Sequence, residues 1–235
     1  METVFITGAN RGIGLGLTRD YLARGDRVFA TARKPENATD LQDLKSTYGE
    51  DLIILPLDVT DEVSIADCVV ATAHFTDALN ILINNAGVDP VGDSYATFGK
   101  LQSESMQAVL LTNSIAPMLV AQSLYPLLKN GENPRIANFS SSMGSISMKQ
   151  SGGSLTYCAS KACLNMFTRG LAFKVKPDGI TVVALDPGWV RTDMGGSSAR
   201  LSVEESAEGC VNVIDDLTIN DTGRYLVWDG SEHAW

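Results

Sequence analysis

The sequence predicts an α/β fold, with one domain built around a doubly wound parallel sheet of about seven strands flanked by helices. Apolar, β-branched runs alternate with stretches of helical period, which is the pattern of βαβ units. No linker rich in Pro, Gly or Ser divides the chain, and 235 residues are enough to bury one large core. Residues 1–235 are therefore expected to form a single domain.

Short apolar runs bounded by turn residues define the expected strands. They are Thr3–Thr7, Arg27–Ala32, Leu52–Leu57, Leu79–Asn84, Arg135–Ser140, Thr181–Asp186 and Arg224–Trp228. The expected helices are Ile13–Arg24, Ala38–Tyr48, Asp61–Phe75, Phe98–Asn130, Leu155–Lys174 and Val203–Asp216. Asp61 and Ser202 are expected N-caps, Gly25, Gly49 and Gly131 are expected to close helices, and Asn113 is expected at a break in the fourth helix. Ser141–Ser154, rich in Ser and Gly, is expected to be a loop over a site.

The chain is acidic, with 18 Lys and Arg against 28 Asp and Glu and a formal net charge of −10. Nucleic acids and anionic membranes both need a basic surface, so neither is an expected partner. No apolar run approaches the ~20 residues that span a bilayer, which also argues against a membrane segment. An anionic ligand would have to be held by local basic residues and backbone amides.

The four cysteines, Cys68, Cys158, Cys163 and Cys210, show neither C-x-x-C spacing nor a disulfide pattern. They are expected to be free and buried, which suits a reducing compartment. With only two histidines, no metal site is expected. The segment from Met1 to Ile6 is already typical of a strand, so no signal peptide is expected. Together these features predict a soluble cytoplasmic protein.

A glycine-rich turn, Thr7-Gly8-Ala9-Asn10-Arg11-Gly12-Ile13-Gly14, joins the first expected strand to the first helix. Glycines there allow a tight turn and close approach of the backbone to a pyrophosphate, which the helix N-terminus attracts with unpaired N–H groups. A purely structural turn is the alternative. Its placement after an apolar strand and before a helix favours dinucleotide binding.

The second strand ends in Ala32, followed by Arg33. An NAD enzyme would have a carboxylate about there to accept a hydrogen bond from the ribose 2′-hydroxyl. Arg33 and Arg11 suit a 2′-phosphate instead, since guanidinium groups bind phosphate through paired hydrogen bonds. Arg33 could also be a solvated loop residue. The absence of the acid together with two arginines predicts NADP(H).

With these features the chain resembles the short-chain dehydrogenase/reductase family along almost its whole length. The motifs that carry the resemblance are Thr7–Gly14, Leu57-Asp58-Val59, Asn84-Asn85-Ala86-Gly87, Asn113, Asn138-Phe139-Ser140-Ser141, Tyr157 with Lys161, and Asp186-Pro187-Gly188. The stretch Pro187–Gly196, and Asp229-Gly230 near Trp235, are similar to C-factor and sniffer-type carbonyl reductases. The resemblance implies an NAD(P)-binding Rossmann-fold catalytic domain that transfers hydride between NADPH and a carbonyl/alcohol substrate.

Tyr157 and Lys161 are expected to carry out the proton transfer. Four positions apart on a helix, they lie on one face. A tyrosine has a pKa near ~10, and we expect the Lys161 ammonium to lower it. In reduction Tyr157 would then protonate the carbonyl oxygen. Such pairs are also common on amphipathic helices, so the surrounding motifs decide in favour of catalysis.

Ser141 and Asn113 complete the expected catalytic set. By resemblance, Ser141 hydrogen-bonds the substrate oxygen, although the run Ser140–Ser142 leaves a one-residue ambiguity. Pro117 follows Asn113 by four residues and has no N–H, so it leaves the Asn113 carbonyl without a helical partner. We hypothesise that this carbonyl holds a water that links Lys161 to solvent. A kink that serves packing is the alternative.

The resemblance also implies a set of cofactor contacts. They are Gly8, Asn10, Arg11, Gly12, Ile13, Gly14, Arg33, Asp58, Val59, Asn85, Ala86, Gly87, Tyr157, Lys161, Pro187, Gly188, Val190 and Thr192. Asp58 would meet the adenine or cap a turn, Thr192 would contact the carboxamide or the pyrophosphate, and Asn84 would fix the central sheet. Val88, Met143, Ile146, Trp189 and Met194 are candidate walls of the substrate pocket, with core packing as the alternative.

The leading functional hypothesis is a carbonyl reductase of aldehydes or ketones. One alternative is a ketoacyl-type or alcohol dehydrogenase, although only Arg191 and Arg200 could supply basic groups near the pocket for a carrier-bound substrate. Another is a dinucleotide-binding signalling protein with low turnover, which would not need an intact catalytic set. A homodimer or homotetramer is expected, with the long helices near Asn113 and Tyr157 as a possible interface.

Overall fold

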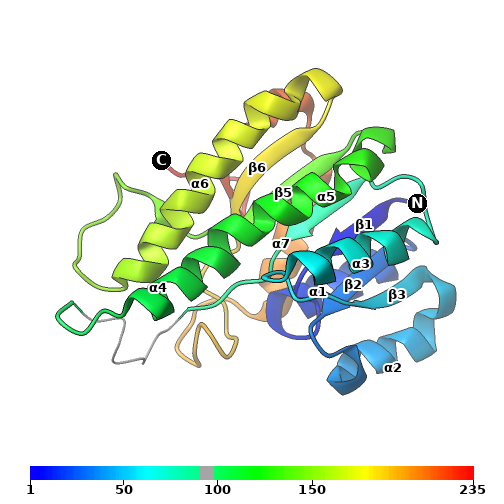
Figure 1. Cartoon of the computed structure of the whole chain (residues 1–235), viewed down its shortest axis with the longest axis horizontal. Helices are drawn as coiled ribbons and strands as arrows, with labels where there is room; N and C mark the ends of the chain where they lie inside the picture. Colours follow the sequence, from blue (N-terminus) through cyan, green and yellow to red (C-terminus); the bar gives the residue numbers. More distant parts are fainter. Residues whose placement is uncertain (90–97) are drawn as a thin grey trace.

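Seven parallel strands in the order β3-β2-β1-β4-β5-β6-β7 form the centre of the computed structural model, which describes residues 1–89 and 98–235 (Figure 1). The strands are β1 Thr3–Ile6, β2 Arg27–Ala32, β3 Leu52–Pro56, β4 Ile81–Asn84, β5 Arg135–Phe139, β6 Thr181–Asp186 and β7 Tyr225–Val227. Each lies within two residues of the strand that the sequence predicts. The predicted doubly wound parallel sheet is therefore confirmed.

Helices cover both faces of the sheet (Figure 1). They are α1 Gly12–Ala23, α2 Thr39–Tyr48, α3 Glu62–Ala73, α4 Ser103–Leu110, α5 Ala116–Asn130, α6 Leu155–Val175 and α7 Val203–Asp215, with a π-helical turn, η4, at Leu111–Ile115. Short 3₁₀ turns lie at Pro35–Asn37, Gly49–Asp51, Ser142–Gly144, Lys176–Asp178 and Ile219–Asp221. Two hydrophobic cores result, one on each face of the sheet, because neighbouring strand residues point to opposite faces. Val4 and Ile6 pack with α1, α2 and α7, whereas Phe5 packs with α3, α5 and α6.

The expected N-caps are confirmed. The Asp61 carboxylate accepts a hydrogen bond from the Val63 amide at 2.9 Å. The Ser202 hydroxyl accepts one from the Glu205 amide at 3.0 Å, and the Glu205 carboxylate accepts one in return from the Ser202 amide at 2.7 Å. This reciprocal pair satisfies two amides at the start of α7 that have no partner within the helix.

The prediction of a long helix over Phe98–Asn130 is wrong at the start of the helix and confirmed at the break near Asn113. It begins at Ser103 and not at Phe98, which lies in a turn and is 82% exposed. Gly99 adopts a φ of +93°, which no right-handed helix contains. The break expected at Asn113 is present as the turn η4, where the Ala116 amide reaches back five residues to the Leu111 carbonyl. Pro117, which cannot donate, directly follows this turn.

One helical segment, Ser103–Asn130, is long and apolar enough by length and composition to cross a membrane. The expectation that no apolar run approaches this length was therefore wrong for these 28 residues. Much of the apolar surface belongs to the core, since Val120, Leu124 and Leu128 of α5 are buried against the sheet and α3.

The strand order reverses between β1 and β4, so the helices that follow these two strands cover opposite faces of the sheet. The turn after β1, the loop after β4 and the segments after β5 and β6 consequently meet at one edge of the sheet. Asn84 fixes this edge, as expected: its amide donates to the Asn138 side chain on β5 at 2.8 Å and to the Pro117 carbonyl at 3.2 Å. Ligands of such folds bind in the crevice at this edge.

Gly131 closes α5 through a close contact rather than through an unusual φ. A Cβ at this position would lie 1.9 Å from the Leu79 carbonyl oxygen. Gly131→Ala is expected to destabilise the protein by roughly 1–3 kcal/mol, because the backbone must move apart. Gly170→Ala is the control. Gly170 lies within α6 with open space around it, so this change should raise the free energy of unfolding by up to about 1 kcal/mol. Urea denaturation measures both, and equal unfolding free energies would contradict the packing argument.

Candidate active site

The glycine-rich turn is fastened to the loop after β4. The Thr7 hydroxyl accepts hydrogen bonds from the Asn85 and Ala86 amides, both at 3.0 Å. The Asn85 side chain donates to the carbonyls of Thr7 at 2.8 Å and Gly8 at 3.0 Å. A Cβ on Gly14 would lie 2.4 Å from the Gly8 carbonyl oxygen, so no larger residue fits there. Asn85, an expected cofactor contact, thus uses its amide to hold the turn in place.

The start of α1 suits an anion. Within residues 1–89 and 98–235, no side chain caps its N-terminus and its first turn contains no acidic residue. Gly12 adopts a φ of +53°, and a Cβ there would lie 3.2 Å from the Thr192 methyl carbon. Amides at a helix N-terminus and the helix dipole favour negative charge. The turn Gly8–Gly14 therefore fits the pyrophosphate of a dinucleotide.

The two arginines expected at the 2′-phosphate differ in their surroundings. Arg33 is exposed at the end of β2, beside buried Ala32. Arg11 is also exposed, and its guanidinium pairs with the Asp193 carboxylate at 2.5 Å. Asp193 belongs to the segment after β6, 182 positions away, and the sequence analysis did not anticipate this pair. Binding of a 2′-phosphate by Arg33 stays a prediction, and Arg11 could bind the phosphate only by giving up its ion pair with Asp193.

Asp58 and Val59 have structural surroundings. The Asp58 carboxylate accepts hydrogen bonds from the Thr60 hydroxyl at 2.6 Å and the Thr60 amide at 2.9 Å. These bonds hold the pKa of Asp58 below its usual value; burial opposes them, and the charge of Arg33 adds the smallest effect, in the lowering direction. Val59 is buried in the core. The turn-capping alternative considered for Asp58 is therefore present, and a contact with adenine stays a prediction.

Tyr157, Lys161 and Ser141 come together at the carboxyl edge of the sheet. Tyr157 and Lys161 are buried on α6, with the Lys161 Nζ 5.7 Å from the Tyr157 ring centroid. Lys161 donates to the Phe139 carbonyl at 2.7 Å. The Ser141 side chain lies close enough to the Tyr157 phenol to lower its pKa, whereas the neighbouring Ser140 hydroxyl is buried and donates to Asn165 at 2.6 Å. Among these serines, Ser141 is thus the one that faces Tyr157.

The pKa values of the pair differ from the expectation. Burial raises the pKa of Tyr157 well above 10, and the charges of Asp89 and Asp186 raise it further, while the nearby Ser141 hydroxyl acts in the opposite direction. Burial lowers the pKa of Lys161 to about 8, which Asp186 and Asp89 partly oppose. The pKa of Tyr157 is thus raised and not lowered, because burial of the phenol dominates, and the lowering expected from Lys161 together with a nicotinamide cation stays a prediction. Tyr157 consequently holds its proton and can act as an acid.

Asn113 acts through its side chain on the loop after β4. Its Oδ1 accepts from the Val88 amide at 2.8 Å, and its Nδ2 donates to the Val88 carbonyl at 2.8 Å and to the Ser160 hydroxyl at 3.0 Å. Gly87 lies between, since a Cβ there would be 3.4 Å from Asn113 Oδ1 and 3.8 Å from Lys161 Nζ. The side chain therefore ties the Gly87–Val88 loop to α6. A relay through the Asn113 main-chain carbonyl stays a prediction.

The segment after β6 closes the crevice from the other side. Gly188 adopts a φ of +82°, and the Pro187 carbonyl accepts from the Ser206 hydroxyl at 2.7 Å. Val190 is buried and forms an isolated bridge with Leu201. The Thr192 methyl carbon lies 3.2 Å from the Cβ position of Gly12. Of the two contacts expected for Thr192, this location favours the pyrophosphate.

The five candidate pocket walls are apolar side chains with substantial exposure. The exposed fractions are 40% for Val88, 37% for Met143, 78% for Ile146, 53% for Trp189 and 44% for Met194. Core packing, the alternative for these residues, was therefore wrong. Trp189 is held by a hydrogen bond from its indole N–H to the Gly195 carbonyl at 2.8 Å. A contact with substrate stays a prediction for all five.

The cysteines are free, as expected, with Cys68, Cys158 and Cys210 buried and Cys163 half-buried. In the part of the chain that the structure describes, no three His, Cys, Asp or Glu side chains gather as metal ligands.

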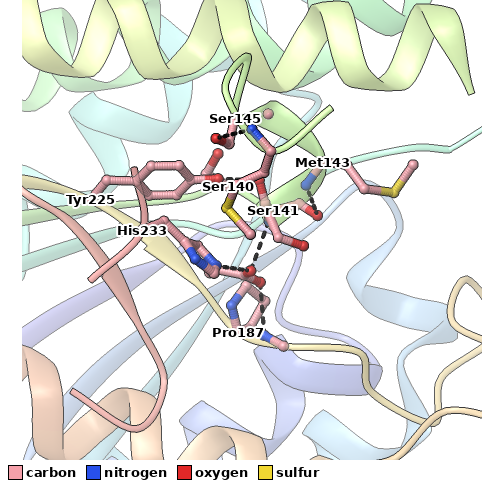
Figure 2. A network of polar contacts seen from close by, with 12 residues as sticks. Ser140, Ser141, Met143, Ser145, Pro187, Tyr225 and His233 are labelled. Carbon is pink, nitrogen blue, oxygen red and sulfur yellow. Dashed lines mark hydrogen bonds and ion pairs between the residues drawn. The ribbon is translucent and has the colours of Figure 1, made fainter. Parts of the chain in front are cut away.

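His233, which was not among the expected site residues, hydrogen-bonds Asp186, whose carboxylate also accepts from the Ser142 amide. No spacing or motif could indicate this contact, because it joins side chains 47 positions apart. In Figure 2 His233 lies near Ser141.

Comparisons with known proteins identify the family of this chain. A family model for short chain dehydrogenases matches residues 2–201. The chain is 36% identical over 165 residues to C-signal of Myxococcus xanthus, covering 70% of this chain and 98% of C-signal.

Two solved structures are also similar. NADPH-bound carbonyl reductase from chicken fatty liver has 39% identity and a TM-score of 0.93, covering 100% of this chain and 99% of the other. Carbonyl reductase Sniffer of D. melanogaster has 35% identity and a TM-score of 0.94, with both chains covered over 100% of their length. With the fold, the glycine-rich turn and the Ser141, Tyr157 and Lys161 cluster in place, this chain belongs to the short chain dehydrogenase family.

Proposed function

We propose that this protein is an NADPH-dependent carbonyl reductase that converts aldehydes or ketones to alcohols. The observation that carries the proposal is the Tyr157 phenol, buried on α6 beside Lys161 and facing Ser141, where burial raises its pKa and favours the protonated form. A phenol that holds its proton is an acid, which suits reduction, whereas alcohol oxidation needs the phenolate as a base. The chicken enzyme, named as an NADPH-bound carbonyl reductase, supports both cofactor and reaction.

The chain's own residues divide the chemistry among them. NADPH, when bound, supplies the hydride. The Ser141 hydroxyl and the Tyr157 phenol both hydrogen-bond the carbonyl oxygen, and Tyr157 transfers its proton to that oxygen as negative charge develops there. Lys161 keeps its ammonium directed at the Phe139 carbonyl below the site, where a water on the Asn113 carbonyl would connect it to solvent. Proton supply to Tyr157 thus comes from the protein side of the crevice.

The cofactor is held by backbone more than by charge. The turn Gly8–Gly14 and the start of α1 would hold the pyrophosphate, with Thr192 beside it. Arg33, next to the small Ala32, would bind the 2′-phosphate. Lys161 and Gly87, which lie close together, would face the nicotinamide end, and Val88, Met143, Ile146, Trp189 and Met194 would form an apolar entrance for the substrate.

Two alternative functions can be distinguished from carbonyl reduction by one assay of NADPH consumption. A ketoacyl-type substrate on a carrier would need free basic groups, but Arg191 donates to the carbonyls of Ala199 and Arg200 within its own loop. The similarity to C-signal supports a signalling protein with low turnover as the second candidate function. NADPH consumption against a panel of aldehydes, ketones and ketoacyl thioesters distinguishes all three. Negligible turnover with every compound would reject the reductase.

Tyr157→Phe removes only the phenol hydroxyl. Turnover is expected to fall by about 10²–10⁴-fold, because the proton donor is lost, while NADPH still binds. Tyr125→Phe is the matched control: its hydroxyl donates to Asp178 on the surface, away from the site. Steady-state reduction and NADPH fluorescence titration measure the two effects. Near-normal turnover of Tyr157→Phe would mean that another group donates the proton.

Arg33→Ala tests the choice of cofactor. Loss of one charge-assisted partner of the 2′-phosphate should cost roughly 1.5–3 kcal/mol, so KM for NADPH should rise about ten- to a hundredfold. KM for NADH, which lacks this phosphate, should barely change. Lys34→Ala, at the neighbouring exposed position, is the control and should have little effect. A wild-type enzyme that prefers NADH would contradict the assignment.

The protein forms a homodimer or homotetramer through the long helices. Met166 and Phe173 of α6 are 73% and 62% exposed, and Ile115 in η4 is 42% exposed. Apolar side chains gathered on long helices are typical of interfaces between subunits. Met166→Asp is expected to lower the sedimentation coefficient toward that of a monomer. Val70→Asp, on α3 at 60% exposure, should not. A monomeric wild-type protein at micromolar concentration would argue against the interface.

A further inference from the structure

The segment Ser231–Trp235, here called the tail, lies against the serine segment Ser140–Ser147. The Ser145 hydroxyl donates to the Ala234 carbonyl at 2.6 Å, and the Ser147 hydroxyl donates to the Trp235 carbonyl at 2.9 Å. The His233 amide donates to the Tyr225 carbonyl on β7 at 2.8 Å. The tail is therefore bonded on one side to β7 and on the other to the segment that contains the catalytic serine.

Asp186 joins three parts of the site. One carboxylate oxygen accepts from His233 Nε2 at 2.8 Å and from the Ser142 amide at 2.7 Å. The other oxygen accepts from the Gly188 amide at 2.9 Å. The side chains of His233 and Asp186 are only 16% and 7% exposed, so these bonds are largely shielded from water. One buried carboxylate thus fixes the tail, the serine segment and the loop after β6 together.

Tyr225 connects the tail to Ser141 by a second route. Its phenol donates to the Ser141 carbonyl, and its ring is fully buried. The rings of His233 and Trp235 both lie with their centroids 5.1 Å from that of Tyr225. Figure 2 shows Tyr225 and His233 approaching Ser140 and Ser141 from the same side, while the Met143 side chain points away. His233 therefore touches both groups that hold the backbone around Ser141.

We propose that His233 is a positioning residue for the reaction, which holds Ser141 in line with Tyr157 through Asp186 and Tyr225. This inference rests on the reductase function proposed above. His233 contacts neither Tyr157 nor Lys161 directly by any bond in the described part of the chain. Its effect on catalysis runs through the backbone of Ser141 and Ser142 and through the charge of Asp186.

The charge of Asp186 provides a readout that a purely structural role would not change. The carboxylate raises the pKa values of both Tyr157 and Lys161, although burial dominates each. The titratable groups that face the Asp186–His233 pair are Tyr157 and Lys161 on α6, Cys210 on α7, Tyr225 on β7, and Asp229 beside His233, with Asp89 also acting on Tyr157 and Lys161. The His233 hydrogen bond offsets part of the carboxylate's charge, so its loss strengthens the effect of Asp186 on Tyr157.

The sign of the pH effect follows from these directions. In reduction, activity is lost as pH rises through the pKa at which Tyr157 or Lys161 gives up its proton. His233→Leu leaves the carboxylate less compensated, so the alkaline limb of the kcat profile moves to higher pH. Asp186→Asn removes the charge, so the limb moves to lower pH. Opposite shifts for the two variants are the signature of the proposed connection.

The experiment compares His233→Leu, His233→Gln and His74→Leu in the full chain. His74 is the only other histidine, and it bonds the Val70 carbonyl on an exposed helix end far from these contacts. His233→Leu is expected to lower kcat by roughly 10- to 100-fold, as small misplacements of reacting groups do, with the NADPH dissociation constant unchanged within about twofold. His233→Gln retains an N–H donor and should recover most of the activity. His74→Leu should match the wild type.

Hydrogen exchange separates this inference from the proposed function, because it needs no turnover. In His233→Leu, amides of residues 140–147 should exchange faster than in the wild type, whereas His74→Leu should leave them unchanged. If the wild type reduces no carbonyl compound, the reductase proposal fails while the exchange data still test the role of His233. Equal kcat and equal exchange for His233→Leu and His74→Leu would overturn the proposal. If His233→Leu does not fold, His233→Gln provides the test. A His233→Gln variant with wild-type stability but a kcat as low as that of Asp186→Asn would also overturn the proposal.

Discussion

The site depends on the pairing of β1 with β4. At this junction the strand order reverses, so the segments that follow the two strands separate and a crevice forms between them. Asn85, just after β4, donates two hydrogen bonds to Thr7, just after β1: one from its main-chain amide to the Thr7 hydroxyl and one from its side chain to the Thr7 carbonyl. The turn that fits a pyrophosphate is therefore placed relative to the Gly87–Val88 loop, which Asn113 connects to α6 and hence to Tyr157 and Lys161. A shift at this junction would separate the cofactor from the proton donor.

The parts of the fold that sequence analysis predicts well are those fixed by local patterns. Strand and helix periods, the caps Asp61 and Ser202, and the interruption before Pro117 all depend on residues within a few positions of one another. The start of the fourth helix was missed for the same reason: Phe98 extends an apolar period, but Gly99 turns the backbone into a left-handed conformation. Likewise, the run Ser140–Ser142 becomes distinguishable only when Asn165 and Tyr157 approach from α6.

The sequence could not predict which distant residues tertiary structure brings into contact. Nor could it predict how burial changes the pKa values of the catalytic side chains. Arg11 meets Asp193, and Asp186 meets His233, through loops whose paths no local period describes. The spacing of Tyr157 and Lys161 places them on one face of α6, but it does not tell where the ammonium points. In the structure it is directed at the Phe139 carbonyl, and desolvation, rather than the neighbouring charge, dominates the pKa of the phenol.

The parallel sheet also has a consequence for the rate of folding. Each neighbouring pair of strands is parallel, so each must be closed by a crossover rather than by a tight hairpin. The β1–β4 pair joins the most distant segments of all, with Thr7 and Asn85 separated by 78 positions. Closure of a long loop loses chain entropy before its contacts form, which slows folding. The crevice for the cofactor is thus completed by the most non-local pairing in the sheet, and the α1–β2–α2–β3 segment can acquire its structure before any dinucleotide site exists.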